Sequence, residues 1–165
     1  MVKAHLKRLT VPRTWPIDRK ETVFTAKPAA GKDRELSISL IVAVRDMLKM
    51  CTNQRELIAM LREKNILVNG VPAKSQRLPV GLFDVITFSK SKQSYRLILN
   101  RHGRFLFVQD KAVTIGKIKN KKQIKGKTQL NLLNGVNLFI EKDDFKVGDS
   151  VVYEEGKVKD TLPLA

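Results

Sequence analysis

Cysteine and histidine, the side chains that most often build disulfides and zinc sites, are nearly absent from this sequence. A single cysteine, Cys51, stands among 165 residues, which excludes an internal disulfide and a metal site built from cysteines. The two histidines, His5 and His102, belong to no cysteine–histidine cluster with the spacing of a zinc site. We therefore expect no bound metal.

Long apolar runs are also missing. The longest uncharged apolar stretch, Leu36 to Val44, is too short to cross a bilayer and contains serines. The first residues contain no apolar segment followed by small residues, so we expect no secretory signal peptide. These features predict a soluble cytoplasmic protein without a membrane partner.

Sequence motifs for catalysis are not found either. The chain contains no G-x-x-x-x-G-K-[ST] or G-x-G-x-x-G phosphate loop, and no serine lies in a G-x-S-x-G turn. We interpret the carboxylates near the C-terminus as a solvated face, with magnesium binding as the weaker alternative. These carboxylates are Glu141, Asp143, Asp144, Asp149, Glu154 and Glu155. We predict no enzyme activity, no cofactor and no small-molecule substrate.

Positive charge, by contrast, is abundant. The chain has 32 Lys and Arg against 16 Asp and Glu, a formal net charge of +16 and a pI of about 10.2. Residues 111–127 contain seven lysines and no acid, whereas residues 128–165 contain four basic and seven acidic side chains. A chain this basic repels itself, so the charge predicts a polyanionic partner.

Residues 1–35 have the composition of a basic extended arm. Pro12, Pro16 and Pro28 interrupt any long helix, and the apolar residues follow no clear period. The arm is either a flexible solubilising tail or a segment that becomes ordered on a phosphate backbone. We favour the second interpretation because Trp15, the only tryptophan, would serve as an apolar anchor and a tail has no need of it.

Two helices are expected next. Apolar residues from Leu40 to Cys51 recur at helical spacing and predict a helix over residues 38–51 whose apolar stripe, including Cys51, faces the core. A second helix is predicted over residues 53–64. Asn53 suits its N-cap, and Glu56, three residues later, completes a capping box.

Strands follow these helices. Ile66-Leu67-Val68 precedes Asn69-Gly70, a strong signal for a tight hairpin in which Asn69 serves the turn and a base contact is the minor alternative. A further strand is predicted over residues 85–88. From residue 95, short strands separated by frequent turns predict a small barrel or sandwich, with the lysine run of residues 117–127 on one of its loops.

The order of helix, capped helix, β-branched strand, Asn-Gly turn and Asp-Val-Ile strand resembles the alpha-L RNA-binding motif. The matching residues are 45–48, 53–57, 61–64 and 66–70. Asn53-Gln54 stands where the motif usually has Ser-Arg, which leaves Arg55 as the nearby cation.

The chain also resembles a narrower family, the archaeal and eukaryotic "e" type of small-subunit ribosomal protein four. The resemblance covers nearly the whole chain in order, through residues 5–9 with Pro12 and Trp15, 27–31, 79–86, 95–97 with Gly103-Arg104, and 129–132 with 147–149. Members of that family normally continue into a C-terminal KOW-type domain, which this sequence does not include. The resemblance implies ribosomal RNA of the small subunit and neighbouring ribosomal proteins as partners.

We therefore predict an α+β protein with a basic N-terminal arm (residues 1–35), an alpha-L RNA-binding domain of two helices and a short sheet (36–90), and a small all-β, barrel-like domain (91–165). Its expected role is structural support of the ribosome. One alternative is a free-standing RNA chaperone or stress protein that acts on transfer RNA or nascent-chain complexes. Docking on anionic lipid or an acidic protein is a second, less favoured because Asp46 interrupts the cations of the first helix.

The candidate RNA-binding residues are mostly cations of the arm, the two helices, the adjoining strands and the lysine run. Such side chains would contact phosphates, because the base edges of double-stranded RNA lie in a deep groove. The candidates are Lys3, Lys7, Arg8, Arg13, Trp15, Arg45, Lys49, Asn53, Arg55, Arg62, Lys64, Asn69, Lys74, Arg77, Lys119, Lys121, Lys122 and Lys125.

Overall fold

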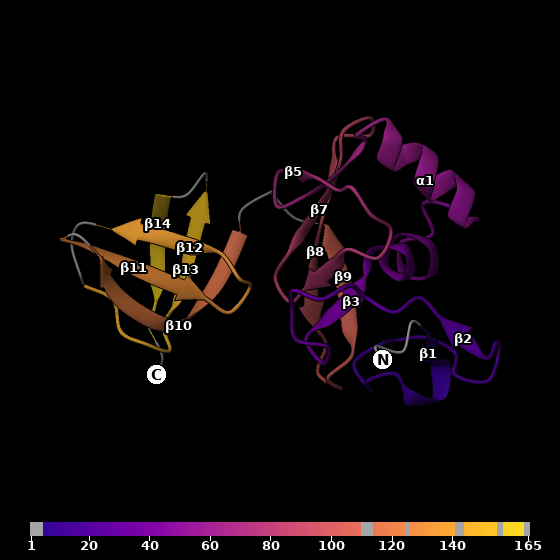
Figure 1. Ribbon diagram of the computed structural model, residues 1–165, viewed down its shortest axis with the longest axis horizontal. Helices are drawn as coiled ribbons and strands as arrows, with labels where there is room; N and C mark the ends of the chain where they lie inside the picture. The colour runs from indigo at the N-terminus through magenta and orange to yellow at the C-terminus, as the bar shows by residue number, and fades with distance from the viewer. Residues whose placement is uncertain (1–4, 110–113, 125, 141–143, 155–156, 164–165) are drawn as a thin grey trace. The chain divides into compact units, whose positions relative to one another are not determined.

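The computed structural model contains two compact units, Met1–Ala112 and Val113–Ala165. It describes residues 5–109, 114–124, 126–140, 144–154 and 157–163. Both units consist mainly of antiparallel strands, and the helices lie in the first unit (Figure 1). The α+β class predicted from the sequence is confirmed at this level.

The first unit is built on a five-stranded antiparallel sheet in the order β5-β4-β7-β8-β9. Its strands are β4 (Ile66–Val68), β5 (Val71–Pro72), β7 (Val85–Phe88), β8 (Gln93–Leu99) and β9 (Phe105–Gln109). Two short antiparallel pairs join it, β1 (Leu6–Lys7) with β2 (Phe24–Thr25) and β3 (Ser37–Ser39) with β6 (Pro79–Gly81). One continuous core of buried apolar side chains connects these pairs to the sheet and the helices.

Residues 5–35 are folded onto this unit, so the prediction of an extended arm is wrong for the described residues. Leu6, Val11 and Trp15 are buried in the core, and a short 3-10 turn covers Arg8–Thr10. The Trp15 indole N–H donates to the Ser37 carbonyl at 2.9 Å, and the Phe105 N–H donates to the Thr14 carbonyl at 2.7 Å. These apolar side chains dock one by one without a regular period, which the sequence pattern could not reveal.

The first predicted helix is shorter and wider than expected. Residues 38–39 belong to β3, and a π-helix, η2, covers Val42–Met47. The Leu48 N–H donates to the carbonyl of Ala43, five residues back, at 3.0 Å, and Lys49 has a φ of 53° that ends the helix. The prediction failed because the backbone of Ser37–Ser39 pairs with Pro79–Gly81 and is unavailable to a helix.

The second helix and the hairpin agree with the sequence. Helix α1 covers Gln54–Arg62, and Glu56 accepts a hydrogen bond from the N-cap Asn53 N–H at 3.4 Å. Asn69 and Gly70 connect β4 to β5 with φ values of 52° and 80°. Both central residues of the turn therefore lie in the left-handed region that a two-residue hairpin loop of this type requires.

The boundary between the units falls later than the predicted domain boundary at residue 91. Strands β8 and β9 pair with β7 and with each other, so they extend the sheet of the first unit. From residue 95 the sequence pattern becomes all-β, which is why both strands were predicted to belong to the β domain. The local sequence pattern indicates that a segment forms a strand, but it does not indicate the sheet to which the strand belongs.

The second unit is a five-stranded antiparallel sheet in the order β12-β11-β10-β13-β14. The strands are β10 (Thr114–Ile124), β11 (Lys127–Leu132), β12 (Asn137–Ile140), β13 (Ser150–Glu154) and β14 (Lys157–Leu162). Ile118, Leu130, Leu138 and Val151 form the centre of its separate apolar core. The lysine run does not lie on a loop as predicted, because β10 extends as a strand through Ile124.

The core of the second unit packs so closely around Gly116 that a larger residue at this position should destabilise it. A Cβ atom at this position would lie 2.7 Å from Leu132 Cδ1 and 3.3 Å from Tyr153 Cε1. Gly116→Ala should destabilise the second unit by about 1–3 kcal/mol, because overpacking forces neighbouring side chains to shift. Differential scanning calorimetry measures this, with fluorescence of Trp15 following the first unit separately. Unchanged melting of the second unit would contradict the close packing around Gly116.

Candidate nucleic-acid interface

A furrow on the first unit gathers several of the predicted cations. It consists of three adjoining depressions that share lining residues along α1, the β4–β5 hairpin and the segment that follows it. Arg55, Ile58 and Arg62 lie three and four residues apart on α1, so they occupy one face of the helix. Lys64 and Lys74 line the central depression with Arg62. We call Arg55, Arg62, Lys64 and Lys74 the furrow cations.

The electrostatic character of the furrow is uniformly positive. Within the described part of the chain, no acidic residue lines any of the three depressions. The four furrow cations are exposed, and none of them forms an ion pair with another described residue. Their charges are therefore available to an external anion, and neighbouring cations of one sign attract a polyanion more strongly than scattered ones.

The helix cap engages Glu56, the carboxylate next to Arg55 in the chain. Glu56 accepts hydrogen bonds from the Thr52 N–H at 2.7 Å, the Thr52 hydroxyl at 3.0 Å and the Asn53 N–H at 3.4 Å. These bonds, the Thr52 N–H first among them, lower the pKa of Glu56 below its usual value. Asn53 is the N-cap of α1, and this structural role explains the residue without a role in RNA binding.

A buried carboxylate shapes the other end of the furrow. Asp84 is fully buried, accepts hydrogen bonds from the Asn69 side-chain amide at 2.9 Å and the Gly81 N–H at 2.7 Å, and forms an ion pair with Lys32. Asn69 in turn accepts a bond from the Val85 N–H at 2.9 Å. The amide of Asn69 thus serves the turn, and Lys32, which lines the furrow, has its charge balanced by Asp84.

Lys32 was missed by the sequence analysis. It lies 52 residues from Asp84 in the chain, and only the fold brings the two side chains together. The motif that ends in Asp84 was identified, but nothing in its spacing identifies the lysine that pairs with it.

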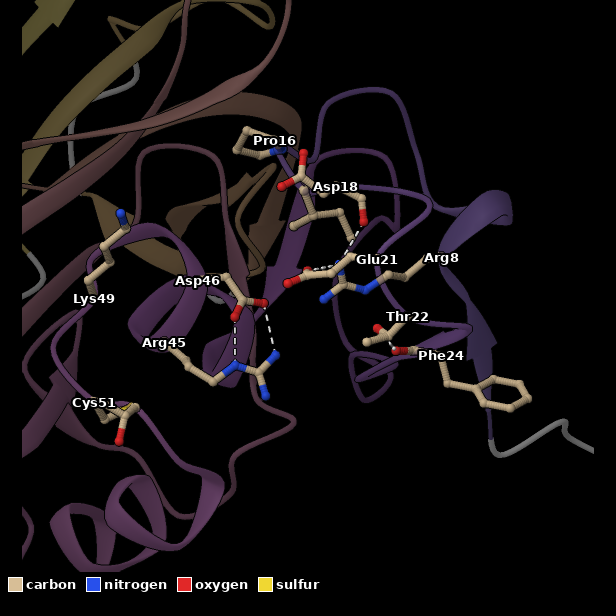
Figure 2. Close-up of a pocket in the computed structure, with 12 residues that line it drawn as sticks. Arg8, Pro16, Asp18, Glu21, Thr22, Phe24, Arg45, Asp46, Lys49 and Cys51 are labelled. Carbon is tan, nitrogen blue, oxygen red and sulfur yellow. Dashed lines mark hydrogen bonds and ion pairs between the residues drawn. The ribbon is translucent and has the colours of Figure 1, made fainter.

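A second cavity, shown in Figure 2, receives three other predicted residues and differs in charge. Arg8, Arg45 and Lys49 line it together with the carboxylates of Asp18, Glu21 and Asp46. Equal numbers of cations and carboxylates produce little net attraction for an anion. The structure therefore separates Arg45 and Lys49 from the furrow cations, with which the sequence analysis had grouped them.

The arginines of this cavity are engaged inside the protein. Arg45 donates to Asp46 through Nε at 2.6 Å and Nη2 at 2.9 Å, and this bidentate pair raises the pKa of Arg45. Arg8 is buried and donates to the Asp18 carbonyl at 2.6 Å and to Glu21 at 2.8 Å. Burial also raises the pKa of the Cys51 thiol at the edge of the cavity.

The remaining predicted residues fall in three places. Trp15 is only 2% exposed, so its predicted role as an anchor for an external phosphate backbone is wrong; it anchors the N-terminal segment to the core. Lys3 and Lys125 lie outside the described residues. Five cations are exposed: Lys7 and Arg13 on the N-terminal segment, Arg77 after β5, and Lys119 and Lys122 on β10. Lys121 is half-buried and donates a hydrogen bond to the Phe145 carbonyl.

The described residues contain neither a cluster suited to a metal ion nor a helix that could cross a membrane. In residues that the structure describes, His, Cys, Asp and Glu form no group of three or more suited to a metal ion. None of the helices in the same residues has the length and apolar character needed to span a bilayer.

Family models match two parts of the chain. The RS4NT (NUC023) domain model matches residues 2–31, and the model of ribosomal family S4e matches residues 91–159. A solved structure with a similar fold is the crystal structure of the 30S ribosomal protein S4e from Thermoplasma acidophilum. It has a TM-score of 0.64 and 25% sequence identity, over 81% of this chain and 71% of that one.

Curated relatives extend the similarity to almost the whole chain. Small ribosomal subunit protein eS4 of Methanosphaera stadtmanae is 39% identical over 97% of this chain and 69% of its own length. The protein of the same name from Methanocaldococcus jannaschii is 37% identical over 98% of this chain and 72% of its own length. For the eS4 protein of Archaeoglobus fulgidus the identity is 39%, over 92% of this chain and 66% of its own length. The chain therefore belongs to the small ribosomal subunit protein eS4 family.

Proposed function

We propose that the chain is a structural component of the small ribosomal subunit that binds folded ribosomal RNA through the furrow cations. The observation that carries the proposal is that four exposed cations line the furrow and that none of the described residues lining it is acidic. In this proposal η2, α1 and the β4–β5–β7 strands act as the alpha-L RNA-binding module. Ribosomal RNA of the small subunit and neighbouring ribosomal proteins are the partners, and the cytoplasmic ribosome is the location.

The furrow suits the backbone of folded RNA better than its bases. Arg55 and Arg62 are separated by seven residues, about 10 Å along the helix axis, so they can contact successive parts of one backbone. Lysine and arginine contacts to phosphate position a protein on RNA and convey little sequence information. Double-stranded RNA is recognised largely through its shape and backbone, which matches a furrow rich in cations and poor in aromatic side chains.

The test is the double variant Arg62→Gln with Lys74→Gln, compared with the unmodified chain. The matched control is Lys49→Gln with Lys90→Gln, which removes the same charge from places where carboxylates already compensate it. Binding to a transcript of archaeal small-subunit ribosomal RNA is titrated by filter binding between 50 and 200 mM salt. We expect the furrow variant to bind more weakly and its salt slope, log K against log salt, to be shallower by about 2.

The control variant should change the slope by less than half as much. Equal slopes for both double variants would show that only total charge matters and would remove the furrow from the proposal. Circular dichroism of each variant separates a loss of binding from a loss of structure.

The alternative of a free-standing RNA chaperone is not favoured, because the relatives are named small ribosomal subunit proteins. Sedimentation of a cell lysate distinguishes the two roles. A ribosomal component sediments with the small subunit in the gradient, whereas a chaperone remains largely at the top.

A further inference from the structure

The second unit presents a sheet face that the proposed function does not use. Strands β10, β11 and β12 are neighbours in the sheet (Figure 1), and residues 111–140, which include all three, contain no Asp or Glu. The acids of this unit lie outside these strands, for example Asp149 before β13 and Asp160 in β14. These three strands are therefore free of carboxylates, and their lysines lie on β10 and β11.

The strand register defines the outer face of this sheet. Leu130 pairs with Leu138 and with Lys121, and the two leucines are buried in the core. The alternate positions must face outward, because successive side chains of a strand point to opposite faces. Two cross-strand rows result, one of Lys122, Gln129 and Phe139, and one of Asn120, Asn131 and Asn137.

Phe139 is the unusual member of this face. Its side chain is 58% exposed, although it lies in a strand and not at a loop tip. Its partner across the strands is Gln129, and Lys122 follows in the same row. A protein-docking surface would be expected to surround such a ring with further apolar side chains. Here the described positions beside the ring in the register are amides, and one lysine, Lys122, follows in the same row.

The amides beside Phe139 are arranged to bind a further group. Gln129 Nε2 donates to Asn131 Oδ1 at 2.6 Å. Within the described residues this bond leaves Gln129 Oε1 as an acceptor and Asn131 Nδ2 as a donor without partners, on two neighbouring side chains of the outer face. An adjacent acceptor and donor match the edge of a nucleobase, which also presents donors and acceptors next to one another.

Cations complete the site. Lys122 is exposed in the same row as Phe139, and a β-bulge between Ile118 and Asn120 adds the exposed Lys119 next to Asn120. An aromatic ring, amide groups and lysines on one open sheet are the elements with which β-sheets bind single-stranded nucleic acid. The ring stacks on a base, the amides contact the base edge, and the cations contact the backbone.

We propose that this face binds an unpaired nucleotide of RNA, with Phe139 stacked on the base, Gln129 and Asn131 on its edge, and Lys119 and Lys122 on the flanking phosphates. Bases inside a duplex are already stacked, so Phe139 selects single-stranded segments or bulged nucleotides. The site belongs to the second unit and shares no residue with the furrow. The furrow is proposed to contact folded RNA, and this face is proposed to contact unpaired RNA. The two proposals are independent, so one can be wrong while the other is right.

The test uses the full chain and fluorescein-labelled decauridine as the single-stranded probe, measured by fluorescence anisotropy at low salt. Phe139→Ala should weaken binding about 5- to 100-fold, because stacking of one base on an aromatic ring accounts for that much affinity. Phe139→Trp should bind within a few-fold of the unmodified chain, since indole is also a stacking surface. Binding to a ten-base-pair RNA duplex should not change in either variant.

The matched control is Leu162→Ala, which removes an exposed apolar side chain from β14 at the other edge of the same sheet. It should leave decauridine binding unchanged. The proposal would be overturned if Phe139→Ala bound decauridine with the affinity of the unmodified chain. It would also be overturned if Leu162→Ala lost as much affinity for decauridine, or if Phe139→Ala lost as much affinity for the duplex. In the furrow variant Arg62→Gln with Lys74→Gln, adding Phe139→Ala should weaken decauridine binding by the same factor as in the unmodified chain. Failure of the furrow and failure of this site are therefore distinguishable.

Discussion

Asp84→Ala is expected to destabilise the first unit by about 3–5 kcal/mol, because it removes one partner of a buried ion pair and leaves the other without compensation. Asp84 has no exposed side-chain surface and receives bonds from Lys32, Asn69 and the Gly81 N–H. Its loss leaves an ammonium group, an amide and a backbone N–H without their acceptor. Urea unfolding followed by the fluorescence of Trp15, the only tryptophan, measures the effect.

Two variants control for this experiment. Asp84→Asn retains one carbonyl oxygen, so it should lose less stability than the alanine variant. Asp144→Ala removes an exposed carboxylate from the second unit and should change the free energy of unfolding by less than about 0.5 kcal/mol. If Asp84→Ala unfolded at the urea concentration of the unmodified chain, the buried network would have no part in stability.

The Asp84 network also connects stability to the furrow. Asn69 holds the turn between β4 and β5, and Val71 and Pro72 of β5 line the furrow next to Lys74. Loosening the turn should therefore weaken RNA binding in Asp84→Ala even under conditions where the unit remains folded. A stable variant with unchanged RNA affinity would show that the hairpin does not position the furrow.

Trp15→Ala is expected to destabilise the first unit by a similar amount, about 3–5 kcal/mol, since truncation of a buried aromatic side chain leaves a cavity. It also leaves the Ser37 carbonyl without the indole N–H that donates to it at 2.9 Å. Far-UV circular dichroism during urea unfolding measures the change, because the variant has no tryptophan fluorescence. Limited proteolysis of residues 5–35 provides an independent readout.

This experiment decides between the two interpretations of the N-terminal segment. A docked segment becomes protease-sensitive when Trp15 is truncated, whereas a free arm that becomes ordered on RNA is sensitive in both forms. Trp15→Phe is the matched control, because it keeps most of the buried aromatic area while it loses the N–H donor and part of the ring; it should cost less than Trp15→Ala, about 1–3 kcal/mol. Equal stability of all three chains would restore the prediction of a free arm.

Elements with a local physical cause were predictable. The cap of α1 depends on Asn53 and Glu56, three residues apart, and the hairpin depends on two adjacent residues that tolerate positive φ. The π-helix was predicted as a longer α-helix because the apolar spacing of residues 40–51 is compatible with both. The pairing of Ser37–Ser39 with Pro79–Gly81, forty residues away, decides where that helix begins.

The candidate site was predicted in part for the same reason. Cations could be found by residue type, but the sequence does not show which of them are paired with a carboxylate. Arg45 is engaged by Asp46, and Arg8 by Glu21, so both differ from Arg62 although all are basic residues. The fold places carboxylates in one cavity and none among the described residues of the furrow, which sequence spacing does not encode.

Composition and local pattern alone established a basic chain of mixed α+β class, a capped helix, a tight hairpin and a family resemblance that the comparisons confirmed. They could do so because net charge, capping and turn preference depend on residues that are adjacent or three to four positions apart. The docking of Trp15, the pair of Lys32 with Asp84, the separation of the furrow cations from Arg45, and the exposure of Phe139 depended on the three-dimensional structure. These features depend on which side chains the fold brings together and which it leaves exposed, and burial and charge compensation exist only in the folded chain.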